Sequence, residues 1–136
     1  MILLLEGIAK TLHEAGIGVF DVEDTEGNIF IGHIPKKPDI AIGIYPSEGL
    51  QDDLWNDTQY PAVQVLMRGN GDVRTALNMA ERVYNELSKL SGTHMDGLYV
   101  INCVANTYSP VNLGLDASGR FECVYTFRFE IMREVI

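Results

Sequence analysis

The feature that most constrains the fold is a long alternation of apolar and polar residues near the C-terminal end of the sequence. From residue 121 to residue 132 the odd positions are apolar, and most of the even positions are polar. The apolar positions are Phe121, Cys123, Tyr125, Phe127, Phe129 and Ile131. Successive side chains of a strand point to opposite faces of its sheet, so the pattern predicts a strand over residues 121–133 with one buried face. This strand exceeds the usual length of about five or six residues, and its apolar face needs a covering layer.

Two amphipathic helices are predicted to supply that layer. The first covers residues 1–15 and ends at Ala15-Gly16, where glycine tolerates the left-handed cap conformation. Its apolar positions are Leu4, Leu5, Ile8, Ala9 and Leu12. The second follows Asp72, a favourable N-cap residue, and ends at Ser91-Gly92. Its apolar stripe consists of Val73, Ala76, Leu77, Ala80, Val83, Tyr84, Leu87 and Leu90.

The second helix is expected to pack on the sheet, because each apolar face is the only large partner for the other. The helix residues expected in this contact are Leu77, Val83, Tyr84 and Leu87. The strand residues expected opposite them are Val63, Val65, Cys123, Tyr125 and Phe127.

Shorter apolar runs predict the remaining strands. They cover residues 17–22, 29–34, 40–45, 60–68 and 98–108, and the first two are expected to form a hairpin through residues 23–28. Residues 46–59 and 109–120 are rich in polar and turn-forming residues, which predicts loops. The order helix, strands, helix, strands predicts one α+β domain over residues 1–136. We expect a mainly antiparallel β-sheet packed by two helices on one face.

The charge balance excludes several classes of partner. The chain of 136 residues has 10 Lys and Arg against 19 Asp and Glu, which gives a net charge of −9. Nucleic acids and anionic membranes are bound through basic side chains, and this chain offers few. The apolar opening lacks a basic segment and is interrupted by Glu6, so we expect neither a secretory signal nor a membrane span.

Residues that could carry chemistry are scattered. His13, His33 and His94 are far apart in the sequence and form no pair with zinc-binding spacing. Cys103 and Cys123 lie in apolar runs, where a free thiol usually behaves as a small hydrophobic group. The histidines and cysteines therefore carry no predicted site.

Two further patterns are also weak. The turn at residues 69–72 precedes a helix, but it lacks the Lys and the Ser or Thr of a phosphate loop. Asp52, Asp53 and Asp57 could bind a hard cation, yet the alternating ligands of a calcium loop are absent, and a solvated acidic loop is expected. We assign no catalytic, cofactor-binding or metal-binding residue, and we predict that the protein is not an enzyme.

The order of four segments resembles a known family. The segments are N-I-F-I-G-H-I-P-K-K-P-D at 28–39, I-A-I-G-I-Y-P-S-E-G at 40–49, Y-P-A-V-Q-V-L-M-R-G at 60–69 and P-V-N-L-G-L-D-A-S-G-R-F at 110–121. With the two helices and the aromatic last strand, they resemble the tail terminator proteins of long-tailed bacteriophages, including minor capsid proteins of phages and prophages. The most specific parts are P-x-V-Q-V-x-x-R-G before the second helix and L-G-x-D-x-x-G-R-F before the last strand.

The resemblance implies a structural protein of the virion that is assembled in the cytoplasm of the bacterial host. Tail terminators form a hexameric ring on the head-proximal end of the tail tube, stop tube polymerisation and provide the head–tail joining surface. The implied partners are further copies of the chain, the major tail tube protein and a head-completion or connector protein. DNA would pass through the ring without specific binding, and no cofactor or membrane is implied.

The segments 46–59 and 110–120 are the predicted assembly surfaces, and we expect them to be poorly ordered in the free subunit. Trp55 is the candidate aromatic anchor, although it could equally cover the edge of its own sheet. The candidate interface residues are Leu50, Asp52, Asp53, Leu54, Trp55, Asp57, Arg68, Asp116 and Arg120. Two other interpretations stay open: another neck or head-completion protein of similar fold, and a small metal-dependent enzyme that uses loop 46–59.

Overall fold

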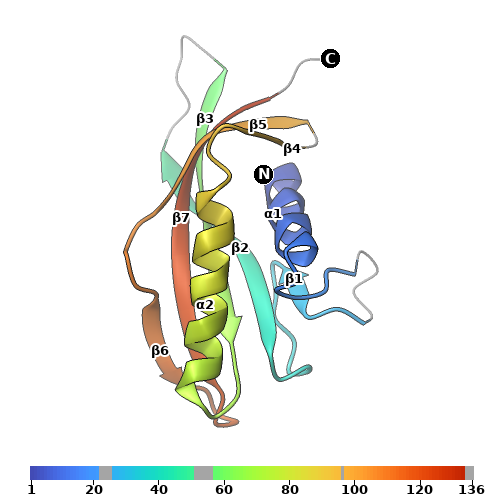
Figure 1. Ribbon diagram of the computed structural model, residues 1–136, viewed down its shortest axis with the longest axis vertical. Coiled ribbons are helices and arrows are strands. Elements are labelled where there is room, and N and C mark those ends of the chain that lie inside the picture. Colours follow the sequence, from blue (N-terminus) through green and yellow to red (C-terminus); the bar gives the residue numbers. More distant parts are fainter. Residues whose placement is uncertain (22–25, 51–56, 96, 134–136) are drawn as a thin grey trace.

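The computed structural model describes residues 1–21, 26–50, 57–95 and 97–133. Two helices lie on one face of a curled sheet (Figure 1). In chain order the elements are α1 (Ile2–Glu14), β1 (Ile29–Ile31), β2 (Ala41–Leu50), β3 (Thr58–Arg68), α2 (Val73–Ser88), β4 (Thr93–Met95), β5 (Leu98–Ala105), β6 (Val111–Leu115) and β7 (Phe121–Arg133).

Strand β7 organises the sheet. The strand order is β1-β2-β3-β7-β5-β4, and β6 also pairs with β7. Strand β3 pairs along one edge of β7, whereas β5 and β6 share the other edge. Strands β1 and β2 are parallel, because residues 32–40 carry the chain back to the start of β1 before β2 begins. The predicted α+β class is confirmed, but the sheet is mixed.

The core lies between the two helices and the sheet. Helix α2 buries Ala76, Met79, Ala80, Val83 and Leu87. The five sheet residues predicted to receive it are all buried in the same cluster, namely Val63, Val65, Cys123, Tyr125 and Phe127. The predicted packing of Val83 and Leu87 is therefore confirmed, and Tyr84 is partly buried against this core.

The prediction for Leu77 is wrong. Its side chain is 42% exposed, although it belongs to the apolar stripe of α2. Successive residues are turned by about 100° around a helix, which places Leu77 on the flank of the face centred on Ala76, Ala80 and Leu87. The apolar stripe in the sequence is thus wider than the face that α2 buries.

The predicted strand over residues 17–22 is not formed in its described part, residues 17–21. The carbonyl of Val19 accepts the N–H groups of Asn28 and Ile29 at 2.9 and 3.1 Å, and the Val19 N–H donates to Asn28 Oδ1 at 2.7 Å. These bonds join Val19 to Asn28 and Ile29, but the described residues form no ladder of the predicted hairpin. Ile17 and Phe20 still pack against the core, which explains why the segment is apolar.

The predicted loop over residues 46–59 is shorter than expected. Strand β2 runs on to Leu50 and β3 starts at Thr58, with Pro46 opposite Val63 and Leu50 opposite Tyr60. Proline is tolerated there because the pairing of β1 ends at Ile44, which leaves Pro46 on an edge. Our expectation of little regular structure is therefore wrong at both ends of this segment, and residues 51–56 lie outside the described ones.

The predicted turn over residues 110–120 contains strand β6, so that expectation is wrong as well. The preceding strand, β5, ends at Ala105 rather than at residue 108. Strand β4 was not predicted. Its Met95 lies against Gly7 of α1, where an added Cβ atom would be 2.7 Å from Met95 Sδ. The absence of a side chain at Gly7 thus permits the close approach of β4 to α1.

Candidate assembly surfaces

The predicted interface residues fall into separate places. Arg68, Asp116 and Arg120 meet against the loop 35–39 at one end of the molecule. Leu50 lies at the end of β2, and Asp57 is exposed directly before β3. The other four predicted residues, Asp52, Asp53, Leu54 and Trp55, lie outside the described part of the chain.

Arg68 ends strand β3 and is 3% exposed. Its Nε donates to the carbonyl of Asp39 at 2.9 Å, and its Nη2 donates to the carbonyls of Pro35 and Pro38 at 2.7 and 2.6 Å. Burial lowers the pKa of Arg68, and the nearby Arg120 lowers it further. The guanidinium therefore holds a loop of its own chain and is not exposed on a surface.

Arg120 holds the same loop from the other side. Its Nε donates to Asp116 Oδ2 at 2.9 Å, and its Nη1 lies 3.3 Å from Asp39 Oδ1 and also donates to the carbonyl of Lys36. The carboxylate of Asp116 accepts the N–H groups of Arg120 and Ser118, each at 2.9 Å. The pKa of Asp116 lies below its usual value. The N–H of Arg120 lowers it most, and the N–H of Ser118 and the Arg120 side chain lower it further. The turn 116–120 is thus tied to the loop 35–39.

The signal for half of this cluster is visible in the sequence. An Asp side chain that accepts backbone N–H groups two to four residues on is a recurrent turn device, and D-x-x-x-R also places a cation within reach. The partners of Arg68 lie 29 to 33 residues upstream in the sequence. No local pattern indicates them.

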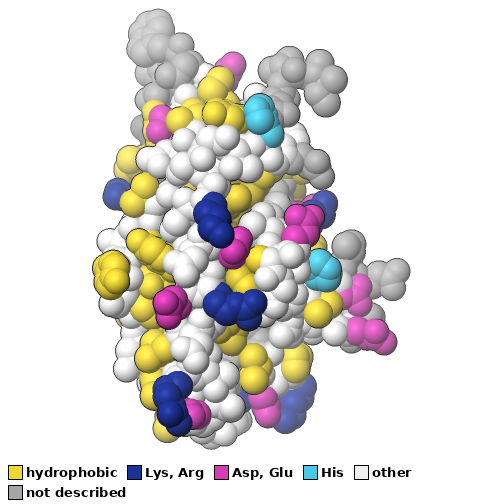
Figure 2. Space-filling view, in the orientation of Figure 1, with side chains coloured by type: hydrophobic (Ala, Val, Ile, Leu, Met, Phe, Trp, Pro, Cys, Tyr) yellow, Lys and Arg dark blue, Asp and Glu magenta, His cyan; other side chains and the backbone are white. Residues whose placement is uncertain are grey.

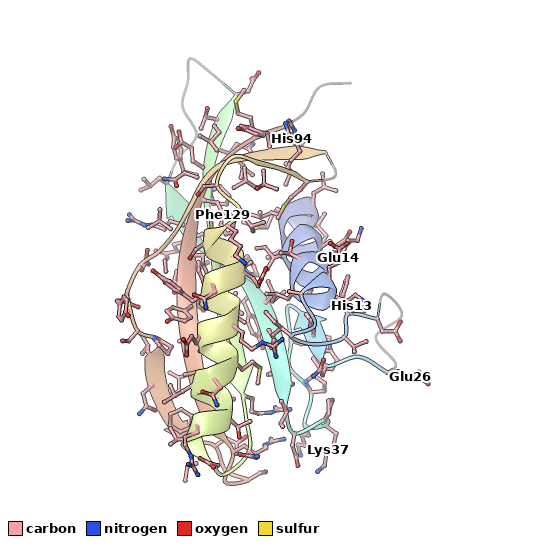
Figure 3. The ribbon with its side chains drawn as sticks, viewed as in Figure 1. His13, Glu14, Glu26, Lys37, His94 and Phe129 are labelled. Carbon is pink, nitrogen blue, oxygen red and sulfur yellow. The ribbon has the colours of Figure 1, made fainter. Side chains whose placement is uncertain are left out.

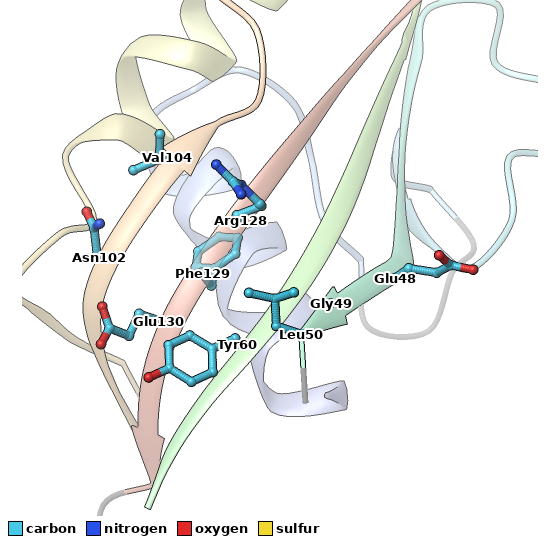
Figure 4. A pocket seen from close by; sticks show the side chains of 9 residues that line it. All are labelled: Glu48, Gly49, Leu50, Tyr60, Asn102, Val104, Arg128, Phe129 and Glu130. Carbon is cyan, nitrogen blue, oxygen red and sulfur yellow. The ribbon is translucent and has the colours of Figure 1, made fainter. Parts of the chain in front are cut away.

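Leu50 lines a pocket on the face of the sheet opposite the helices. The pocket has a volume of about 410 Å³, and its lining includes Tyr60, Asn102, Val104, Arg128 and Glu130. Leu50 is 71% exposed and sits opposite Tyr60, while Arg128 and Glu130 project from β7 beside them (Figure 4). The mixture of exposed apolar groups and both signs of charge suits contact with a polypeptide.

Groups that could carry out a reaction are not gathered in the described ranges of the chain. These ranges hold no group of three or more His, Cys, Asp or Glu residues that could bind a metal ion. His13 and His94 lie well apart (Figure 3), and His13 Nδ1 accepts the N–H of Phe20 at 3.0 Å.

The prediction that both cysteines are free and buried is confirmed. Burial raises the pKa of Cys103 to about 12 and that of Cys123 to about 11. Both side chains are therefore neutral thiols at neutral pH, and the thiolate form that reacts with electrophiles or metal ions is scarce.

The predicted assembly segment 110–120 presents exposed apolar side chains that were not among the candidate interface residues. Strand β6 carries Val111, Leu113 and Leu115 with their side chains 51%, 52% and 63% exposed. Figure 2 shows hydrophobic side chains gathered along the left margin of the molecule, where β6 and the segment leading into it lie. Large apolar patches of this kind mark interaction sites in many proteins.

The comparison with protein families agrees with this picture of a protein that works through its surfaces. A model of the family described as bacteriophage tail terminator protein matches residues 11–133, which contain the whole sheet and α2. No curated protein matches the sequence. None of the described helices is long and apolar enough to span a membrane. The family match covers nearly the whole chain, and the chain therefore belongs to the bacteriophage tail terminator protein family, a structural family of the phage tail.

Proposed function

We propose that six copies of this chain form a ring that caps the head-proximal end of the phage tail tube. The ring stops tube polymerisation and provides the surface that joins the tail to a head-completion or connector protein. The observation that carries this proposal is the family match over residues 11–133. The partners are thus other copies of the chain, the major tail tube protein and the connector.

The arrangement of surfaces supports a ring. A closed ring needs head-to-tail contacts between two unlike surfaces of the same subunit. The described chain offers an exposed strand edge at β6 and, at another place, the pocket between Leu50, Tyr60 and Arg128. Arg68 and Arg120 hold the loop 35–39 in one conformation, which gives a further part of the surface a defined shape.

The charge supports a conduit for DNA. Six copies at −9 each would carry −54. A negative wall repels the phosphate backbone, so DNA would pass through without adsorbing.

The proposal is tested by assembly and by tail length. Native mass spectrometry and negative-stain microscopy of the purified chain should show a ring of six, alone or on isolated tail tubes. A phage that lacks this gene should make overlong tails unjoined to heads, and supplying the chain should restore tails of uniform length. Uniform tails without the chain would refute tube termination. If the chain is then needed only for joining to heads, it is a neck protein of similar fold.

Trp55 offers a second test of the loop 46–59. Trp55→Ala should leave the subunit folded and give overlong or unjoined tails, because an interface tryptophan buries a large area on docking. A Trp55→Ala variant that unfolds alone, or that supports normal infectious tails, would remove this loop from the assembly surface.

A further inference from the structure

We propose that the exposed edge of β6 is the surface through which this chain binds a second copy of itself. This inference rests on the proposed ring and assigns one of the two surfaces that each ring contact requires. The surface consists of Leu77, Tyr108, Val111, Leu113 and Leu115, and is called the β6 strip below.

One edge of β6 is open. In the described part of the chain β6 pairs with β7 alone, so its other edge presents backbone N–H and carbonyl groups to solvent. Native proteins usually shield such edges with charged side chains or proline. The five residues of β6, V-N-L-G-L, contain neither, although the strand is short and has an irregular register between Asn112 and Gly114, where Asn112 Oδ1 accepts the Gly114 N–H at 2.6 Å. An exposed edge of this kind can receive a strand from another chain.

The apolar surface continues from β6 onto α2. Tyr108 is 88% exposed, and its ring centroid lies 6.3 Å from that of Tyr84 on α2. The backbone of Tyr108 is fixed, because its carbonyl accepts a hydrogen bond from Tyr125 Oη at 2.9 Å. Next to it, a pocket of about 350 Å³ is lined by Leu77, Tyr84 and Pro110 among others. The strip therefore combines a strand edge with a hollow that can receive a side chain.

The area of the β6 strip is suited to a contact between subunits. The five side chains of the β6 strip are 42% to 88% exposed. One tyrosine alone can bury about 150–250 Å². Together with the backbone edge, the strip can form the centre of a standard interface of about 800 Å² per partner.

Charge favours a second copy as the occupant. Two copies that each carry −9 repel one another, so they approach at lowest cost where the surface has no charge. The strip approaches this condition, since its five side chains are uncharged and Glu81 is the one charged residue among those that line its hollow. The usual partner of an open strand edge is another strand. In the same chain β4 is a second edge strand, since it pairs with β5 alone among the described strands, and it could supply that partner. A contact between unlike edges is head-to-tail, as ring closure demands.

The test compares charged substitutions in the strip with one outside it. Leu113→Glu puts a carboxylate on the open edge, and Val19→Glu is the matched control, because Val19 is 50% exposed and lies outside both the β6 strip and the pocket at Leu50. Native mass spectrometry and light scattering over a range of concentrations report assembly, and thermal unfolding reports the fold. We expect Leu113→Glu to need at least about tenfold more subunit for half-assembly. Val19→Glu should assemble like the wild type. Those amides of residues 111–115 that do not donate to β7 should gain protection from hydrogen exchange when the wild type assembles.

Other outcomes overturn the inference in distinguishable ways. If the wild type assembles and Leu113→Glu assembles equally well, the β6 strip is not the contact, while the ring stands. If Val19→Glu also prevents assembly, the effect is one of charge in general and the assignment of the site is wrong. A wild type that stays monomeric alone and on tail tubes refutes both the ring and this inference. Should Leu113→Glu fail to fold, Tyr108→Glu replaces it, because a side chain that is 88% exposed contributes little to the fold.

Discussion

Replacing Arg68 with methionine should release the loop 35–39 while leaving the core of the sheet intact. The methionine keeps an unbranched apolar stem of similar length but removes the three hydrogen bonds to the carbonyls of Pro35, Pro38 and Asp39. Arg120 would still hold the loop through Lys36 and Asp39. We therefore expect two effects: the loop 35–39 opens more often, and the free energy of unfolding of the whole protein falls.

The magnitude follows from the contacts of Arg68. A hydrogen bond from a charged donor contributes about 1.5–3 kcal/mol to the free energy of unfolding. The three bonds do not add fully, because Pro38 and Asp39 are exposed residues whose carbonyls can bind water instead. We therefore expect Arg68→Met to lower the free energy of unfolding by about 2–4 kcal/mol, a large part of the usual 5–15 kcal/mol or so.

Two measurements separate the local from the global effect. Urea unfolding gives the change in the free energy of unfolding. Limited trypsin digestion under native conditions measures how fast the peptide bond between Lys36 and Lys37 is cleaved, which reports how often the loop opens. Arg74→Met is the matched control, since the Arg74 side chain is 81% exposed and pairs with Asp72 on the surface. The reasoning is refuted if Arg68→Met keeps the wild-type unfolding midpoint and the wild-type rate of cleavage after Lys36.

Two further predictions concern the core. Leu87→Ala should lower the free energy of unfolding by about 2–5 kcal/mol because Leu87 is fully buried, whereas Leu77→Ala should change it by less than about 0.5 kcal/mol; urea unfolding of both variants checks this contrast. The folded-state pKa values of about 12 for Cys103 and about 11 for Cys123 lie above the ordinary 9.0. The folded state therefore binds the two thiol protons more tightly than the unfolded state does. This contribution to the free energy of unfolding is complete below pH 9.0 and is lost as the pH rises through the folded-state pKa values. The free energy of unfolding should fall above pH 9.0, and less steeply in Cys123→Ala; an identical slope in both proteins would contradict the assignment.

Periodicity predicted the elements that have one buried face. The apolar residues of β7 recur at every second position, and those of α2 recur at helical spacing, in both cases over many residues. Most of the buried positions of the two elements are those that this spacing predicts. The cap at Asp72 was also predictable, because its side chain accepts the N–H of Arg74 at 3.0 Å, as local chemistry suggests. What these elements share is that the information lies within a few residues.

The missed elements depend on partners that are distant in the sequence. The extension of β2 through Pro46 and Gly49 is set by pairing with β3, which overrides the low strand propensity of both residues. At Gly49 an added Cβ atom would lie 2.3 Å from the carbonyl oxygen of Tyr60, so this glycine serves close pairing rather than a turn. Strand β6 is also defined by its pairing with β7. Its alternation of apolar residues covers only five positions and includes Asn112 and Gly114, which are turn-forming residues, so a turn was predicted there.

The pairing of the basic side chains bears on the passage of DNA through the proposed ring. Arg68 and Arg120 bind oxygens of their own chain, and Lys37, Arg74 and Lys89 lie within 3.2 Å of neighbouring carboxylates. A cation held in this way can neutralise a phosphate only by giving up an existing contact. These five cations are therefore poorly placed to bind phosphate, and the chain as a whole keeps its net charge of −9. The same negative charge makes two subunits repel each other. A chain that must not retain DNA but must bind its own copies therefore needs a contact surface with little charge. The five uncharged side chains of the β6 strip provide such a surface.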